Sequence, residues 1–476
     1  MNARATGLVI GPLAFAVTVL TAPPAGMTEP GWLVAGLVVW MASWWMTEAI
    51  PLTATGLLPF VVLPLGGVMT ASETASAYYE PILFLLLGGA FLALAIERTG
   101  LHRRLSLAIL NTIGTGGGQM RLLLAFMISA ALLSMLISNT STALIMMPMA
   151  LAVLAGGSSA NEDTATSQTE GLSGALPMGI AFAASIGGLG TIVGSPTNGI
   201  AVALLDDMIG LKISFAQWML YGVPIVLVGV PIAAVLIARV QRIADRPFDM
   251  RAAHEAIADD TAWTIAERRL VPIIAITFAL WMSRLWVAPY LPEGSWTDGT
   301  IAIIAALLLF VLPDGTGRPL LKWDEANRAP WDVIMMFGGG LALAAGMQAS
   351  GLAEWLGNAL LPLEVVPLVF VALAIVAMVV LVTEFASNVA TASAIIPVVA
   401  SLSAALGLGE QAILLAMPAA LAASWGFILP AGTGPNAIAW STGRLTIGRL
   451  VRAGLLLDLV GIFLLVGMVW MIAALV

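Results

Sequence analysis

The sequence predicts an all-α polytopic membrane protein with eleven transmembrane helices and two re-entrant hairpins. Of its 476 residues, 60% are hydrophobic and 10% are charged, whereas a soluble domain has about 25% charged residues. Two polar triads, Ser138-Asn139-Thr140 and Ser387-Asn388-Val389, interrupt long apolar runs. Irregular backbone at membrane depth is tolerated only where it is buried in protein or lines a cavity. Matched interruptions in two halves of a chain indicate the binding site of a transporter.

A spanning helix needs ~20 apolar residues, and most apolar stretches of the chain have about this length. We expect spans at 6–22, 31–47, 52–67, 81–110, 174–206, 215–238, 268–288, 298–313, 330–356, 411–441 and 450–475. The first of these could pass for a signal peptide, but in a chain this apolar we interpret it as a spanning helix.

The two triads lie in shorter apolar pairs, at 121–156 and 369–405. Each arm of a pair is short for a full span, which favours a re-entrant hairpin with the triad at its tip. Two ordinary short spans per pair are the alternative. Charge does not separate the two, because both arrangements return the chain to the same side.

The basic residues give the orientation. With a cytoplasmic N-terminus, 17 of the 19 Lys and Arg residues fall on the inside, and only Lys212 and Arg284 fall outside. This asymmetry follows the positive-inside rule. We therefore expect a multi-pass protein of a bacterial inner (plasma) membrane, with its N-terminus in the cytoplasm and its C-terminus outside.

Three landmarks recur in the same order in two halves of the chain. The segment at 86–101 matches 337–352, the first triad matches the second, and Gly194-Ser195-Pro196-Thr197-Asn198 matches Gly432-Thr433-Gly434-Pro435-Asn436. Because each half has an odd number of spans, the two halves have opposite orientations in the membrane, as in an inverted repeat. The expected organisation is an extra N-terminal transmembrane helix at 1–30, a first repeat at 31–242 with hairpin 121–156, a cytoplasmic connector at 243–266, and a second repeat at 267–476 with hairpin 369–405.

A triad at a hairpin tip offers groups for both anions and cations. The helix that starts there presents free backbone N–H groups and its positive dipole end, which suit an anion. The helix that ends there presents free carbonyl oxygens, which suit a small cation. Helix capping alone is the plainer interpretation of one triad, but it does not explain two matched ones. The Gly- and Pro-containing segments at 194–198 and 432–436 predict breaks in two further helices; simple kinks are the alternative there.

With these motifs in place, the chain resembles the divalent anion/sodium symporter family, whose members carry dicarboxylates, citrate or sulfate. The resemblance rests on both triads, on the segments 194–198 and 433–436, and on the motifs at 44–51 and 383–386. It covers nearly the whole chain. It implies eleven spans with two re-entrant hairpins, a homodimer in the lipid bilayer, an elevator-type motion, and substrate held between the hairpin tips with a sodium ion beside each tip.

The resemblance also implies roles for single residues. The first sodium ion would be held by Ser134, Ser138, Asn139 and Gly194, and the second by Thr383, Ala386, Asn388 and Gly432. The substrate would meet Ser138, Asn139, Thr140, Ser387, Asn388, Val389, Thr433 and Gly434. The sequence departs from the family pattern at Val389, where Thr is frequent, and at Gly434 and Thr197, where prolines are common.

The sequence thus predicts a secondary active transporter that imports C4-dicarboxylates such as succinate, malate or fumarate together with sodium. A sodium-independent dicarboxylate exchanger and a citrate or sulfate carrier are the alternatives. An enzyme is not expected, because the chain has no cysteine, no histidine in an expected span and no Ser-x-x-Lys motif near an apolar break. Neither an activated nucleophile nor a metal site can then be assembled. Sodium is expected only as a coupling ion, with no organic cofactor and no nucleic-acid partner. Glu384, an acidic residue in an apolar segment, is expected to make structural hydrogen bonds, with proton coupling as the alternative.

Overall fold

The computed structural model describes residues 3–113, 118–157, 169–243 and 262–475. Within these ranges the regular elements are helices, without a β-strand. Seven of the described helical segments are long and apolar enough to cross a membrane: Pro81–Thr99, Asn139–Gly156, Phe215–Gln241, Ile265–Tyr290, Trp331–Ala349, Asn388–Ala405 and Ile447–Ala473. The predicted all-α polytopic membrane architecture is confirmed. Most of the predicted connector 243–266 lies outside the described residues.

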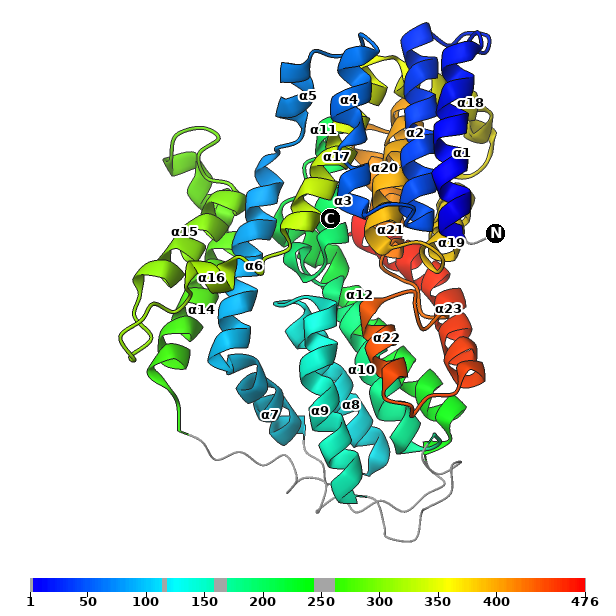
Figure 1. Cartoon of the computed structure of the whole chain (residues 1–476). Coiled ribbons are helices and arrows are strands. Elements are labelled where there is room, and N and C mark those ends of the chain that lie inside the picture. The colour runs from blue at the N-terminus through cyan, green and yellow to red at the C-terminus, as the bar shows by residue number, and fades with distance from the viewer. Residues whose placement is uncertain (1–2, 114–117, 158–168, 244–261, 476) are drawn as a thin grey trace.

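We divide the helices into two groups, which also contact each other (Figure 1). The peripheral group comprises α1–α6 and α14–α18, and the central group comprises α8–α12 and α19–α23; α7 packs on α8. In the peripheral group α1 packs against α2, and α6 packs against α14 and α15. The groups meet where α2, α17 and α18 contact α20, where α6 and α17 contact α11, and where α14 contacts α12.

The peripheral group contains several short helices with clear sequence signals. Thr28 and Thr70 cap α2 and α5 by accepting hydrogen bonds from backbone N–H groups of the first turn. The bounds are α1 (Ala3–Leu20), α2 (Glu29–Thr47), α3 (Leu52–Thr55), α4 (Leu58–Leu65), α5 (Ala71–Ala77), α6 (Pro81–Thr99), α14 (Ile265–Val287), α15 (Asp298–Val311), α16 (Trp323–Ala326), α17 (Trp331–Ala349) and α18 (Leu352–Leu360).

The central group is built of close helix contacts at glycines. A Cβ on Gly187 of α10 would overlap the backbone of Ala131 in α8, and a Cβ on Gly222 of α12 would overlap the carbonyl oxygen of Leu189. The bounds are α8 (Gln119–Ser134), α9 (Asn139–Gly157), α10 (Leu172–Gly188), α11 (Pro196–Ile209), α12 (Phe215–Gln241), α19 (Leu368–Thr383), α20 (Asn388–Ala405), α21 (Ile413–Ala422), α22 (Gly434–Ser441) and α23 (Ile447–Ala473). The link α7 is Leu101–Ile113.

Several stretches expected as single spans are broken helices. The expected span 81–110 divides at Gly100, and 330–356 divides near Gly351; both glycines have φ +78°, a left-handed conformation that favours glycine. The stretch 52–67 divides into α3 and α4. The stretches 174–206 and 411–441 are interrupted where the sequence predicts breaks, before α11 and before α22.

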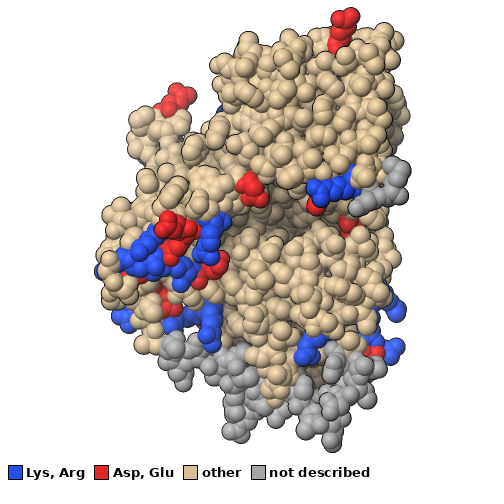
Figure 2. Space-filling model, viewed as in Figure 1, with Lys and Arg blue, Asp and Glu red and all other residues tan. Residues whose placement is uncertain are grey.

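The helices that follow the two triads lie at opposite ends of the molecule. In Figure 1, α8 and α9 occupy the lower part of the view and α20 the upper part. Figure 2 shows that the visible Lys and Arg side chains lie at mid-height and below, and that this face is hollowed at mid-height. The triads therefore approach the same middle region from the two ends.

Candidate binding site

The first triad forms the turn between α8 and α9. α8 ends at Ser134 and α9 begins at Asn139. The hydroxyl of Ser138 accepts a hydrogen bond from the backbone N–H of Ser141 at 3.2 Å and donates one to the Ser141 hydroxyl at 3.0 Å. The first turn of α9 is thus capped by the triad, and its other backbone N–H groups point toward the turn.

The second triad has the same local structure. α19 ends at Thr383, Ser387 is the N-cap of α20, and its hydroxyl accepts from the backbone N–H of Ala390 at 3.1 Å. Val389 occupies the position that Thr140 has in the first triad. The two tips therefore share the N-terminal cap but differ by one hydroxyl.

The two broken helices supply a second matched pair. Thr191 accepts from the N–H of Gly194 at 3.0 Å and donates to the carbonyl oxygen of Met135 at 2.6 Å, which ties this break to the first turn. Thr433 caps α22 by accepting from the N–H of Asn436 at 3.3 Å. Ser195, which matches Thr433 in the repeat, makes no side-chain hydrogen bond to the start of α11. Both breaks thus end in a helix that starts at the cavity, but only α22 has a side-chain cap.

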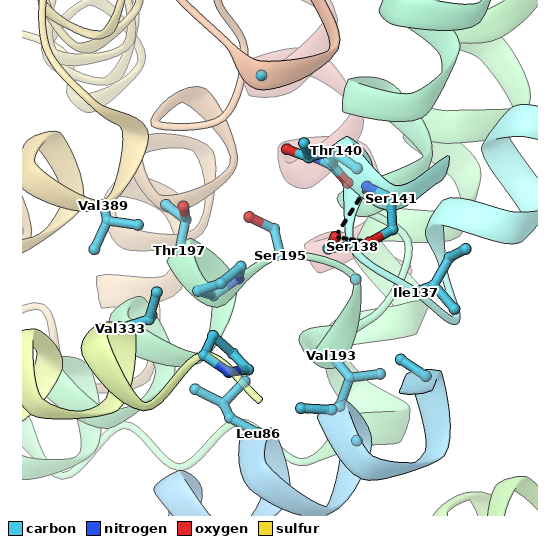
Figure 3. Close-up of a pocket in the computed structure, with 18 of the residues that line it drawn as sticks. Leu86, Ile137, Ser138, Thr140, Ser141, Val193, Ser195, Thr197, Val333 and Val389 are labelled. Atoms are coloured by element: carbon cyan, nitrogen blue, oxygen red, sulfur yellow. Dashed lines mark hydrogen bonds between the residues drawn. The ribbon is translucent and has the colours of Figure 1, made fainter. Parts of the chain in front are cut away.

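One cavity of about 450 Å³ lies between these four segments. Figure 3 shows Ser138 and Thr140 on one side, Val389 on the other, and Ser195 and Thr197 between them. The walls come from α6, the first turn, the break at 193–197, residues 328–334, the second turn, and residues 432–435. Among the described lining residues the charged ones are Arg328 and Glu97, whose side chains are 3.9 Å apart and partly exposed.

The structure brings most of the expected site residues to this cavity. The lining includes Ser138, Asn139, Thr140, Gly194, Ser387, Asn388, Val389, Gly432, Thr433 and Gly434. Ser134, Thr383 and Ala386 are not among the lining residues and are buried. They lie behind the tips. Ser134 contacts Asn139 and Thr383 contacts Asn388, and both asparagines line the cavity.

Oxygen atoms surround the side-chain amide of Asn139. One end of this amide lies 3.2 Å from the carbonyl oxygen of Ala184, 2.6 Å from the Ser134 hydroxyl and 3.1 Å from the carbonyl oxygen of Gly194. With nitrogen at this end, the amide donates to these oxygens. With the amide turned so that its oxygen faces them, four oxygen atoms converge, and such a set suits a small cation.

The second half repeats the contact between hydroxyl and amide. The Thr383 hydroxyl lies 2.8 Å from the Asn388 amide oxygen and donates to the carbonyl oxygen of Ala423 at 2.7 Å. Among the described residues, no group of three or more His, Cys, Asp or Glu could hold a metal ion. At the second tip the Glu384 carboxyl lies close by, with one oxygen 3.5 Å from a Cβ built on Gly432.

Further polar residues support the breaks. Asn198 donates from its amide to the carbonyl oxygens of Gly188 and Thr191, both at 2.8 Å, and Asn436 donates to Leu429 at 3.1 Å. The amide oxygens of both asparagines are buried without a hydrogen-bond partner. Each asparagine thus holds a broken helix in place. Each also keeps an amide oxygen free to accept a hydrogen bond, at corresponding positions of the two halves.

Sequence reasoning missed part of the lining. Leu86, Gly89, Val333 and Arg328 face the cavity, but they come from regular helices and a loop of the peripheral group, where no motif marks them. The pairing of 86–101 with 337–352 in the repeat was the available signal for Leu86 and Gly89. Nothing in the local sequence distinguishes Arg328 from other loop arginines.

Comparison with known proteins identifies the family. The sequence profile described as "Sodium:sulfate symporter transmembrane region" matches residues 2–476. The chain belongs to the sodium:sulfate symporter family. Its members are membrane transporters and not enzymes, as the sequence predicts.

Two relatives of this symporter match over nearly its full length. The sodium-dependent dicarboxylate transporter SdcS of Staphylococcus saprophyticus is 38% identical over 480 residues, which is 98% of this chain and 90% of the relative. The protein of the same name from Staphylococcus aureus (strain USA300) is 36% identical over 478 residues, with 99% and 91% covered. Among solved structures, the symporter shares a fold with the Alcanivorax borkumensis YdaH transporter at a TM-score of 0.54, with 16% identity and coverage of 100% and 98%.

Proposed function

We propose that this chain imports C4-dicarboxylates of the succinate, malate or fumarate type, coupled to the inward sodium gradient. The full-length similarity to two transporters named as sodium-dependent dicarboxylate carriers supports this assignment. The observation that carries it is the cavity on which the two triads and the two helix breaks converge. The predicted site residues that line this cavity would bind the substrate.

The geometry favours an anion with two acidic groups. Four helix starts, at Asn139, Pro196, Asn388 and Gly434, face the same cavity, and each presents backbone N–H groups and a positive dipole end. Hydroxyls of Ser138, Thr140, Ser387 and Thr433 add donors for carboxylate oxygens. Two opposed clusters of donors suit one carboxylate at each tip. The apolar walls from Leu86, Val333 and Val389 suit a short carbon chain between them.

Sodium would bind beside each tip. Ser134, Ser138, Asn139 and Gly194 would hold the first ion, and Thr383, Ala386, Asn388 and Gly432 the second. The converging oxygens around the Asn139 amide support the first assignment, and the Thr383–Asn388 contact supports the second. The cations would offset the negative charge of the substrate, so sodium would bind before the dicarboxylate.

The transport cycle would be an elevator motion of the central group against the peripheral group, in a homodimer. The two helices around each triad, α8–α9 and α19–α20, would form a re-entrant hairpin. The two halves of the chain would be an inverted repeat. Their positions toward opposite ends of the molecule support this topology (Figure 1). The visible basic side chains lie at mid-height and below, which supports a cytoplasmic lower end (Figure 2).

Uptake of labelled succinate into proteoliposomes tests the proposal. The vesicles receive an inward sodium gradient or an equal potassium gradient, and contain either unlabelled succinate or no substrate. Sodium-dependent uptake into empty vesicles is the expected result. Uptake that does not depend on sodium but needs preloaded succinate would identify an exchanger. It would also remove the basis for the two sodium sites. Competition by citrate or sulfate that exceeds competition by malate and fumarate would reassign the substrate.

A further inference from the structure

Another cavity, of about 720 Å³, opens where α12 begins and α23 ends. We call it the α12–α23 cavity. Its walls come from residues 210–213, the first two turns of α12, residues 410–414 and the end of α23, and none of them lines the transport cavity. α21 and the red end of α23 lie close together in Figure 1, and Trp470 joins them by donating to the carbonyl oxygen of Leu414 at 3.1 Å. The transport function proposed above gives this cavity no role.

The α12–α23 cavity carries one side chain of each charge. Lys212 lines it from the loop before α12, and Glu410 lines it from the turn before α21. Both side chains are exposed. Within the described ranges, neither of them forms an ion pair or a side-chain hydrogen bond. Because an ammonium group only donates and a carboxylate only accepts, the cavity offers one site for an anionic group and one for a cationic group.

Uncharged polar groups accompany the two charges. Tyr221 is only 6% exposed, yet it lines the cavity, and its hydroxyl makes no hydrogen bond within the described part of the chain. Gln217 lies one turn before it on the same face of α12. The Gln217 amide oxygen accepts from the backbone N–H of Ser214 at 2.9 Å, which leaves its NH₂ group for the cavity. A buried tyrosine hydroxyl usually has a partner, so a ligand is the natural partner here.

Two exposed apolar strips lead away from the cavity. On α12, Leu220 lines the cavity, and Leu227 follows two turns later on the same face; they are 42% and 68% exposed. On α23, Trp470 lines the cavity, and Phe463, 67% exposed, precedes it by two turns. α12 and α23 pack against each other, and one begins where the other ends. Both strips therefore run in the same direction for ~10 Å, as two parallel acyl chains would.

The charges around the cavity favour a ligand that contains a cation. Asp206 and Asp207 are exposed in the last turn of α11, ~6 Å along the helix from Gly210 at the cavity wall. Together with Glu410 they outnumber Lys212, so a ligand with net negative charge is disfavoured. A dicarboxylate would also leave the apolar strips uncovered. A zwitterion with two acyl chains satisfies both the charges and the strips.

We propose that the α12–α23 cavity binds one phospholipid with an amine headgroup. Its phosphate contacts Lys212 and accepts from Tyr221 and Gln217, and its ammonium group contacts Glu410 and donates to the amide oxygen of Gln411. Its acyl chains lie along the two apolar strips. Neither sodium nor dicarboxylate enters this assignment, so it does not rest on the proposed function.

Native mass spectrometry of the full-length protein in detergent tests the proposal. Phosphatidylethanolamine, phosphatidylcholine and phosphatidylglycerol with identical acyl chains are titrated separately into wild type, Lys212→Gln and Glu410→Gln. Lys322→Gln and Glu354→Gln are the matched controls, because both side chains are exposed and lie outside the cavity. Melting temperatures check that each variant folds.

We expect wild type to bind phosphatidylethanolamine at least about tenfold more tightly than phosphatidylglycerol, since hydrogen bonds to charged groups distinguish the headgroups. Glu410→Gln should lose this preference. Lys212→Gln should weaken binding of all three lipids, because all three contain the phosphate. Both control variants should bind like wild type.

Tighter binding of phosphatidylglycerol than of phosphatidylethanolamine would overturn the proposal in favour of an anionic-lipid site. Equal binding of the three headgroups would also overturn it, by reducing the cavity to an apolar groove. So would displacement of phosphatidylethanolamine by succinate, which would identify a second dicarboxylate site. If a charge variant does not fold, Tyr221→Phe decides: it keeps the shape of the side chain, and must weaken phosphatidylethanolamine binding severalfold. No readout depends on transport, so failure of the dicarboxylate assignment would leave the test intact.

Discussion

At the scale of single residues, the two tip asparagines have the same position and related partners. Each amide contacts a hydroxyl of the preceding helix end, Ser134 for Asn139 and Thr383 for Asn388. Each also borders the cavity. A tip asparagine thus connects the buried oxygens behind the tip with the space in front of it, which is the position needed to couple cation binding to anion binding.

Asn388→Ala is expected to lower sodium-driven succinate uptake at least about tenfold, which corresponds to the loss of ~1.4 kcal/mol of interaction. The substitution removes an amide that would contact both ions, and it leaves the Thr383 hydroxyl with its bond to Ala423. Initial uptake rates in proteoliposomes measure the effect, with melting temperature as the check on folding. Asn358→Ala, at an exposed position of α18, is the matched control. Near-normal uptake in Asn388→Ala would refute the role of this residue.

Val389→Thr is expected to strengthen substrate binding, because it adds at the second tip the hydroxyl that Thr140 provides at the first. A new hydrogen bond contributes about 1 kcal/mol, so KM for succinate should fall about fivefold. The side chain is half-buried at the cavity wall and similar in shape to Thr. A KM that is unchanged or higher, with sodium dependence retained, would show that the substrate does not reach this position.

At the scale of elements, glycines decide how closely the helices of the central group can pack. Gly187→Ala should destabilise the protein by about 1–3 kcal/mol, because its Cβ would overlap the backbone of Ala131. Gly467→Ala in α23 has no atom within 4 Å of its new Cβ and should be neutral or stabilising by up to ~1 kcal/mol. Thermal unfolding in detergent compares the two. Equal melting temperatures would show that α8 and α10 can separate without cost.

An ion-pair network joins α6 to the loop after α15. Arg98 pairs with Asp314 and Glu325, and Arg318 pairs with Glu325 at 2.6 Å. Burial alone would raise the pKa of Asp314, but hydrogen bonds from Thr316 and Arg98 outweigh it and hold the pKa well below its ordinary value. The pKa of Glu325 is lowered in a similar way, by hydrogen bonds from Lys322 and Arg318 that outweigh burial.

These lowered pKa values determine a pH dependence of stability. A carboxyl group with a folded pKa below its unfolded pKa stabilises the fold above the unfolded value, and this stabilisation is lost as the pH falls through the folded value. Asp314→Asn should therefore melt at a lower temperature than wild type at neutral pH, and the difference should shrink in acid. Melting curves across this range provide the measurement. A difference that grows in acid would contradict the assignment of Asp314 as an ionised partner of Arg98.

The sequence predicted where polar residues begin these helices better than it predicted how long the helices are. Ser138 and Ser387 begin helices, as the triads indicate, because a hydroxyl that can accept from a backbone N–H favours a helix start. The helix ends at Gly100 and Gly351 were missed, since a glycine in an apolar run is also tolerated inside a helix and only its backbone conformation distinguishes the two. The burial of Ser134 and Thr383 behind the tips depends on packing between distant segments, which local sequence does not contain.

At the scale of the whole molecule, the proposed elevator motion requires the central group to slide along α17 and α18. The two groups touch where Gly340 of α17 faces Ser393 of α20, with 3.5 Å between the Cβ of Ser393 and a Cβ built on Gly340. This spacing is suitable for a disulfide. The chain contains no cysteine, so a pair introduced here has no competing thiol.

Gly340→Cys with Ser393→Cys should form a disulfide under mild oxidation and stop uptake, and reduction should restore uptake. Gly36→Cys with Thr18→Cys is the control, because it links α1 and α2 within the peripheral group and should leave uptake unchanged. A gel shift measures crosslinking and labelled succinate measures transport. Full uptake by the crosslinked Gly340–Ser393 pair would mean that this contact does not move during transport.

The cavity combines helix starts with apolar walls, and this combination guides the design of inhibitors. Its volume of about 450 Å³ exceeds what a four-carbon diacid fills, and its apolar walls include Leu86, Val333, Ile334 and Val389. A compound that keeps both acidic ends and carries a compact apolar branch would occupy the substrate position and this spare volume together. Such a compound would hold α6 and the start of α17 against the central group, and would block the carrier without being transported.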